Sequence, residues 1–289
     1  AGSRYLDPDG SFPNHIPNPE NEAAMQSILD AVQESKADLG IIFDTDVDRA
    51  GAVLSDGTEL NRNRIIAMMA AILLREHPGT TIVTDSITST GLAAFIRKHG
   101  GVPPRFKRGY RNVINESMRL NREGHDSQLA METSGHGALK ENYFLDDGAY
   151  LVTRLLIELA RAKKEGYTLE SLIADLAEPA ESKEFRMNIL VPDFKAYGQK
   201  IIDELNVYAA SQPGWSVAPD NFEGVRVNLD KAHGDGWFLL RLSLHDPLIP
   251  LNIESDSVGG VRQIAAELAP FLRPFDQLDT SALLAFAGC

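Results

Sequence analysis

Helical and strand-like patterns alternate along the chain from Glu22 to Lys164, and this alternation constrains the fold more than any other feature. Residues 22–34 place apolar side chains on one stripe of a helix, and the apolar run Leu39–Phe43 follows as a buried strand. The same signals predict helices at 61–75, 91–99, 113–122 and 148–164, and strands at 80–85, 105–110 and 128–131. Such alternation is typical of a mainly parallel sheet flanked by helices, so this part of the chain is predicted to be α/β.

A charged, alanine-rich stretch between residues 166 and 184 separates this pattern from a different one. Beyond it we expect helices at 194–211 and 260–271, and strands at 185–191, 224–229, 237–244 and 248–255. The second pattern predicts a smaller α+β domain at the carboxyl end, with a boundary near residue 180. The first 20 residues are dense in turn formers and predict a loop.

The charge balance excludes several classes of partner. Lys and Arg number 28 against 41 Asp and Glu, giving a net charge of −13, so the long-range field repels nucleic acid and anionic lipid. An anionic sugar phosphate can bind only where local Arg residues, backbone amides or a cation reverse that field. The one cysteine, Cys289, rules out a disulfide framework, and the longest apolar run, Ile65–Leu74, is too short to span a bilayer. With no signal-peptide pattern recognised, we expect a cytoplasmic protein.

Three aspartates follow the predicted strand Leu39–Phe43 at every second position, as Asp44, Asp46 and Asp48. In an extended segment, side chains at this spacing point the same way, and three hard carboxylate oxygens suit Mg²⁺. The carboxyl end of a strand is also where α/β sheets keep their ligands. A solvated acidic turn without a metal is the alternative interpretation of the same pattern.

Two other kinds of site also have closely spaced aspartates. A calcium-binding EF-hand needs Gly at loop position six and a carboxylate at position twelve, where this chain has Arg49 and Ser55. The EF-hand is therefore excluded. A haloacid-dehalogenase-type phosphatase opens with two such aspartates after an apolar strand, and it stays as an alternative.

A second candidate site is the segment Met131–Gly137, which follows the strand predicted at 128–131. Glu132 supplies acceptor oxygens and Ser134 a hydroxyl, which suits adjacent sugar hydroxyls, and the glycines allow close backbone approach. A loop without function is the alternative. Asp146 and Asp147 are expected to cap the long helix that begins at Gly148.

A third candidate site is the segment Arg241–Pro247, between two strands of the carboxyl-terminal domain. An Arg guanidinium and a Ser hydroxyl in a tight turn can bind a phosphate through charge-assisted hydrogen bonds, which makes Arg241 and Ser243 candidates. A plain hairpin turn is the alternative.

In this order, the three segments resemble the signature loops of the α-D-phosphohexomutase superfamily, which includes phosphoglucomutase and phosphomannomutase. The family patterns are D-G-D-G-D-R for metal, G-E-x-S-G-H for sugar and R-x-S-G-T-E-P for phosphate. The resemblance covers essentially the whole chain. It implies part of the second domain at 1–58, the third domain at 59–180 and the phosphate-binding domain at 181–289.

The resemblance also implies a reaction and a set of roles. The family moves a phosphoryl group between C1 and C6 of a hexose phosphate with Mg²⁺, through glucose or mannose bisphosphate. It implies Mg²⁺ ligands at Asp44, Asp46 and Asp48, and catalytic roles for Arg49 and His136. It implies substrate contacts at Glu132, Ser134, Arg241, Ser243 and His245.

The chain departs from the family pattern at several positions. Leu244, His245 and Asp246 replace Gly, Thr and Glu of the phosphate loop, and Tyr110 stands where the family often has His. No Ser-His dipeptide, which marks the family's phosphorylated serine, occurs in the 289 residues. We therefore expect a fragment without the first domain that does not catalyse turnover by itself. A fragment that only binds sugar phosphates or a partner protein is the alternative.

Overall fold

The computed structural model describes residues 2–243 and 246–289, and it divides the chain into two compact units. The first unit ends at Ala177 and the second runs from Glu178 to Cys289. Each unit has its own core and is described by itself. No helix among the described residues is both long and apolar enough to cross a bilayer.

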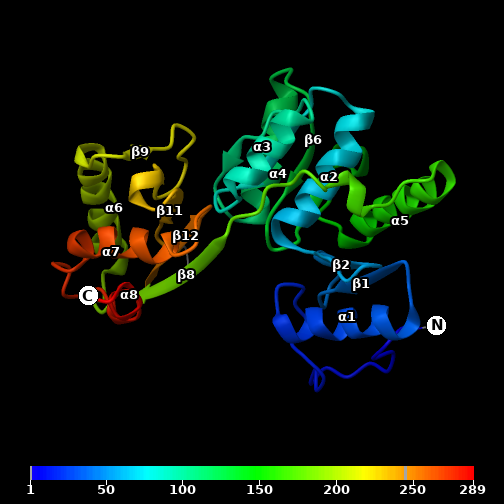
Figure 1. Cartoon of the computed structure of the whole chain (residues 1–289), viewed down its shortest axis with the longest axis horizontal. Helices are drawn as coiled ribbons and strands as arrows, with labels where there is room; N and C mark the ends of the chain where they lie inside the picture. Colours follow the sequence, from blue (N-terminus) through cyan, green and yellow to red (C-terminus); the bar gives the residue numbers. More distant parts are fainter. Residues whose placement is uncertain (1, 244–245) are drawn as a thin grey trace. The chain divides into compact units, whose positions relative to one another are not determined.

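The first unit opens with a small antiparallel sheet in the order β1-β2-β3. Its strands are β1 (Leu39–Phe43), β2 (Ala50–Leu54) and β3 (Glu59–Leu60). Helix α1 (Glu22–Ser35) packs on β1 and β2, as Figure 1 shows at the blue end of the chain. Gly40 makes this packing close, because a Cβ there would lie 2.4 Å from the Val32 side chain.

A second sheet in the same unit has the order β5-β4-β6-β7. Its members are β5 (Arg105–Phe106), β4 (Thr81–Asp85), β6 (Ser127–Met131) and β7 (Gly137–Leu139). Strands β5, β4 and β6 are parallel, whereas β7 returns antiparallel to β6. The helices of this part are α2 (Arg62–Glu76), α3 (Thr90–Lys98), α4 (Tyr110–Arg122) and α5 (Gly148–Glu165).

Helix α2 joins the two sheets into one core. Every side chain from Ile65 to Ala70 is fully buried, so the helix is apolar on nearly every side. Its core partners include Ala52 and Leu54 of the small sheet, and Ile82 and Leu129 of the second sheet. The two sheets of the first unit are therefore held by one hydrophobic core.

The second unit is built on an antiparallel sheet in the order β8-β12-β11-β10-β9. Its strands are β8 (Glu181–Asn188), β12 (Leu248–Ser255), β11 (Gly236–Leu240), β10 (Val225–Leu229) and β9 (Trp215–Val217). Its helices are α6 (Phe194–Ser211), α7 (Gly260–Leu272) and α8 (Ser281–Ala287). Helices α6 and α7 pack on the sheet through a core that includes Ile201, Leu205, Ile264 and Leu268.

The fold class predicted from the sequence is confirmed, but the position of one strand is wrong. Strand Leu39–Phe43 belongs to an antiparallel sheet, because it pairs with the unpredicted strand β2 and not with β4. The parallel sheet begins only at β4.

Two predicted strands are shorter than expected. The strand expected at 105–110 ends at Phe106, since Gly109 at φ 113° leads into helix α4. The strand expected at 237–244 ends at Leu240, and residue 244 lies outside the described residues.

Candidate active site

The acidic segment Asp44–Asp48 forms the connection between β1 and β2. It is a series of bends and not the extended segment expected, and Val47 adopts φ 64° in the left-handed region. The carboxylate oxygens nevertheless converge, because one from each of Asp44, Asp46 and Asp48 lies within 4.8 Å of the others. Three hard oxygen donors at this separation could hold a divalent cation.

Arg49 fixes the base of this acidic loop through Asp44. The Arg49 backbone amide donates to Asp44 Oδ1 at 3.1 Å, and the Arg49 side-chain Nε donates to Asp44 Oδ2 at 2.8 Å. Burial opposes ionisation of Asp44, but these hydrogen bonds outweigh it and lower the pKa of Asp44. Burial and the neighbouring Asp44 raise the pKa of Asp48 to about 6.

The acidic loop and the start of β2 contact the segment Glu132–His136 through the backbone. Arg49 and His136 form an antiparallel bridge, and the Ala50 amide donates to the Gly135 carbonyl at 3.4 Å. Gly135 has φ 99°, and a Cβ there would lie 2.9 Å from the Ala50 carbonyl oxygen. The absence of a side chain at Gly135 therefore allows two predicted sites to meet.

The first residue of α5 makes a second backbone contact with the acidic loop. The Gly148 amide donates to the Val47 carbonyl at 3.0 Å, and a Cβ on Gly148 would lie 2.8 Å from that oxygen. Asp147 caps α5, as predicted, by accepting from the Tyr150 amide at 2.9 Å.

His136 lies between the acidic loop and α5. Its Nδ1 is 2.8 Å from Asp146 Oδ2 and 3.6 Å from Asp48 Oδ2. Burial opposes protonation, but the hydrogen bond to Asp146 raises the pKa of His136. The Tyr110 ring stacks on the imidazole with centroids 5.0 Å apart and an interplanar angle of 22°.

Two of these contacts were not found from the sequence. Asp146 was expected to be a helix cap, whereas it binds His136 and the Gly137 amide. A signal for Asp146 was available in the sequence. A helix has one N-cap residue, here Asp147, so the neighbouring Asp146 was free to bind a different partner. Tyr110 gave no sequence signal for stacking on His136, because the contact depends on tertiary packing.

Glu132 is almost fully buried at 3% exposure. Its Oε1 accepts from the Gly109 amide at 2.6 Å, and Ser134 Oγ lies 3.5 Å from Oε2. Burial, followed by the negative charge of Asp85, raises the pKa of Glu132 to about 7. Near neutral pH this side chain is therefore able both to donate and to accept a hydrogen bond.

Arg241 and Ser243 belong to the second unit, in the connection between β11 and β12. The Ser243 amide donates to the Leu248 carbonyl at 3.0 Å, and Ser243 Oγ accepts from the Asp246 amide at 3.2 Å. The segment is thus a hairpin connection shaped in part by Ser243. His245 lies outside the described residues.

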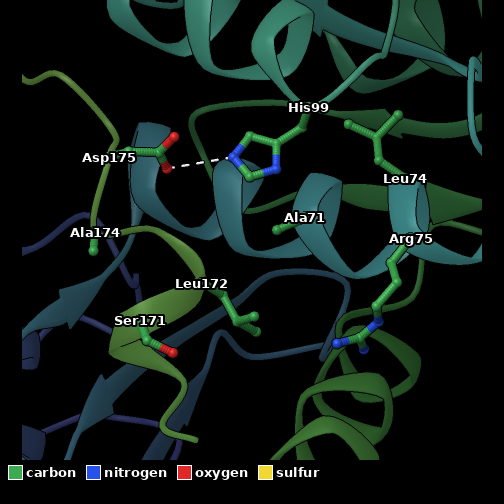
Figure 2. A pocket seen from close by; sticks show the side chains of 8 residues that line it. All are labelled: Ala71, Leu74, Arg75, His99, Ser171, Leu172, Ala174 and Asp175. Carbon is green, nitrogen blue, oxygen red and sulfur yellow. Dashed lines mark hydrogen bonds and ion pairs between the residues drawn. The ribbon is translucent and has the colours of Figure 1, made fainter.

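A separate pocket of about 510 Å³ lies in the first unit (Figure 2). His99 contributes a ring whose Nε2 is 3.3 Å from Asp175 Oδ1, and Leu74 and Leu172 provide apolar walls. Of the described residues predicted to be functional, none lines this pocket. The volume of a pocket is therefore not sufficient to identify the candidate active site.

Two family models match consecutive parts of the chain. Residues 3–57 match alpha/beta/alpha domain II of phosphoglucomutase/phosphomannomutase, and residues 61–179 match domain III. A phosphomannomutase/phosphoglucomutase of Pseudomonas syringae is 32% identical over 265 residues, covering 91% of this chain and 52% of the relative. A phosphoglucomutase of Neisseria meningitidis is 30% identical and covers 90% of this chain and 53% of the relative.

A crystal structure of a phosphoglucomutase/phosphomannomutase family protein from Burkholderia thailandensis is also similar. It has a TM-score of 0.76 and 29% identity, and the match covers 94% of this chain and 55% of that one. The chain belongs to the phosphoglucomutase/phosphomannomutase family, within the α-D-phosphohexomutase superfamily. It spans about half the length of the curated relatives it matches.

Substituting Val47 by Gly should stabilise the first unit. A β-branched residue at φ 64° is strained, and Gly adopts this conformation freely, so we expect a gain of about 1 kcal/mol. Thermal unfolding should show a Tm increase of about 3 °C. Val102→Gly is the control, since Val102 is exposed and its φ is not positive, and it should not raise the Tm. Equal shifts in both variants would contradict the strain argument.

Glu132 should make stability depend on pH. Because its folded pKa of about 7 exceeds its ordinary value of 4.5, its contribution is complete below pH 4.5 and is lost as pH rises through 7. The loss amounts to about 3 kcal/mol. Glu132→Gln should therefore gain stability relative to the unmodified chain between about pH 5 and pH 8, as measured by urea unfolding in EDTA. Glu165→Gln, at the exposed end of α5, is the control and should show no such gain.

Proposed function

We propose that this chain supplies the metal-binding, sugar-binding and distal-phosphate-binding parts of a phosphohexomutase. The reaction is phosphoryl transfer between C1 and C6 of a hexose phosphate, with glucose or mannose bisphosphate as intermediate. The observation that carries the proposal is the backbone contact that joins the acidic loop to Glu132–His136 within one unit. We propose the domain division 1–58, 59–180 and 181–289.

Asp44, Asp46 and Asp48 would hold Mg²⁺. Each carboxylate oxygen has two lone pairs, so Asp44 can accept from Arg49 and still offer a position to a cation. When bound, Mg²⁺ would offset the negative charge of the phosphoryl group during transfer.

The remaining roles belong to the side chains around the acidic loop and to the hairpin of the second unit. Glu132 and Ser134 would bind sugar hydroxyls, and Arg49 would lie next to the reacting phosphate. His136, with Nδ1 held by Asp146, keeps Nε2 as the nitrogen that can exchange a proton with a hydroxyl. The phosphate that is not transferred would be bound by Arg241, Ser243 and His245.

The catalytic serine would come from outside these 289 residues, which contain no Ser-His dipeptide. The phosphatase alternative requires Asp44 as an exposed nucleophile. The Asp44 side chain is only 1% exposed, and both of its oxygens accept from Arg49. This burial argues against that alternative.

Metal binding tests the first part of the proposal. Asp46→Asn removes the negative charge of the most exposed aspartate in the loop, so we expect the affinity for Mn²⁺ to fall at least about tenfold. Electron paramagnetic resonance of free Mn²⁺, with Mg²⁺ as competitor, measures the affinity. Asp7→Asn is the control, as an exposed aspartate outside the loop. Equal affinity in the two variants would exclude a metal at this loop.

A chimera tests the reaction. In this chimera, the chain takes the place of the matched region of the Pseudomonas aeruginosa phosphomannomutase/phosphoglucomutase, and the rest of that protein is kept. The two are 31% identical over 274 residues. We expect conversion of glucose 1-phosphate to glucose 6-phosphate, followed with a coupled dehydrogenase. Glu132→Ala in the chimera should lower kcat/KM by at least about a hundredfold, because sugar hydroxyls lose a buried partner. A folded chimera that binds the sugar phosphate without turnover would favour the non-catalytic alternative.

A further inference from the structure

The ring of Tyr110 covers one face of the His136 imidazole. The ring centroids are 5.0 Å apart and the ring planes are inclined by 22°, so the two rings are stacked and not edge-to-face. The His136 side chain is 17% exposed, whereas Tyr110 is 36% exposed. The imidazole is therefore the more buried member of the pair, and the phenol ring lies between it and the solvent on that face.

Packing of the hydrophobic core does not explain this contact. Among the described residues, the apolar cluster to which α4 contributes includes Val113 and Ile114 but not Tyr110. Tyr110 is the first residue of α4, and its ring extends from the helix to the segment Glu132–His136. The ring is thus placed on a residue of the candidate site and not on the core.

The turn before α4 fixes the position of Tyr110. Gly109 has φ 113°, a conformation that favours glycine, and its amide donates to Glu132 Oε1 at 2.6 Å. At the other end of the phenol ring, Arg111 Nε donates to the Tyr110 hydroxyl at 3.1 Å. The turn Gly109–Tyr110 therefore contacts both ends of the segment Glu132–His136, one by a hydrogen bond and the other by stacking.

His136 needs such support because two carboxylates lie near the same ring nitrogen. Its Nδ1 is 2.8 Å from Asp146 Oδ2 and 3.6 Å from Asp48 Oδ2. A tilt of the imidazole would exchange one acceptor for the other. Since the Tyr110 ring lies nearly parallel to the imidazole, a tilt would press the two rings together on one side and separate them on the other. The stack therefore opposes the exchange.

We infer that Tyr110 is a positioning residue, whose flat ring keeps His136 Nδ1 on Asp146 and leaves Nε2 free to meet a substrate hydroxyl. The ring carries this role, and the Tyr110 hydroxyl is secondary. The use of Nε2 in turnover rests on the proposed function, whereas the positioning itself rests on the contacts within the first unit.

Proton NMR of the full chain in EDTA tests the positioning without requiring turnover. An Nδ1 proton held by a carboxylate exchanges slowly with water and resonates far downfield of the backbone amides, and His136→Gln assigns it by its loss. We expect this resonance to stay sharp in Tyr110→Phe, which keeps the ring, and to broaden at least about threefold in Tyr110→Ala. His233, whose Nδ1 lies 2.9 Å from Glu267 Oε2 in the second unit, is the internal reference and should not change.

A leucine variant separates the flat ring from apolar bulk. Tyr110→Leu keeps an apolar side chain without an aromatic plane, so we expect the His136 resonance to broaden as in Tyr110→Ala. This variant decides the matter if Tyr110→Ala unfolds. A sharp resonance in folded Tyr110→Leu or Tyr110→Ala would overturn the inference. Loss of the resonance in Tyr110→Phe, or its absence from the unmodified chain, would do the same.

Kinetics in the chimera separate positioning from binding. Tyr110→Ala should lower kcat for glucose 1-phosphate about fivefold and change KM less than about twofold, because His136 loses its orientation while the sugar contacts remain. Tyr110→Phe should keep kcat within about twofold of the unmodified chimera. Tyr143→Ala, at a site 86% exposed in the first unit, is the control and should change neither constant.

The two assays fail in different ways. A raised KM with unchanged kcat in the Tyr110→Ala chimera would overturn the inference, since Tyr110 would then act in binding. An unmodified chimera without turnover would instead contradict the proposed function, and the His136 resonance would still decide whether Tyr110 positions the imidazole.

Discussion

The candidate site depends on the backbone contact between the hairpin that carries the acidic loop and the segment Glu132–His136. Two glycines make it possible, because a side chain at Gly135 would collide with the backbone at the start of β2, and one at Gly148 with the acidic loop. The contact links the hairpin of the small sheet to the end of β6 and the start of α5. The shared core around α2 holds these elements together, so packing remote from the site sets the positions of its charged groups.

Sequence reasoning located most helices and strands because their apolar periodicity is strong. The bounds of α6, β1 and β12 agree with those expected, while β2 was missed. Its sequence, AGAVL, is short and begins with small residues, so its burial comes from packing against α1 and α2 and not from its own pattern. The parallel sheet was predicted correctly for β4, β5 and β6, but local pattern does not reveal which strands pair.

The first two candidate segments were recognisable because their polar residues follow predicted strands. The geometry of the acidic loop was not predicted. An extended segment was expected, in which alternate side chains point the same way, and the loop is instead a series of bends. The chain reaches convergence by a different route, with Val47 in the left-handed region where the family pattern has Gly. Tyr110 reaches His136 only through the tertiary fold, so no spacing in the sequence could identify it, and for Asp146 the one signal was that Asp147 already caps the helix.

The charges of the acidic loop are suited to a divalent cation. Three carboxylates and the Arg49 guanidinium leave a net charge of minus two, in a chain whose overall field is already negative. Because burial and Asp44 raise the pKa of Asp48, protons compete for this loop in mildly acidic solution. A cation bound there would share Asp44 with Arg49 and weaken that ion pair. In the proposed enzyme, the Arg49 guanidinium, beside the acidic loop, would interact with the phosphate of the substrate.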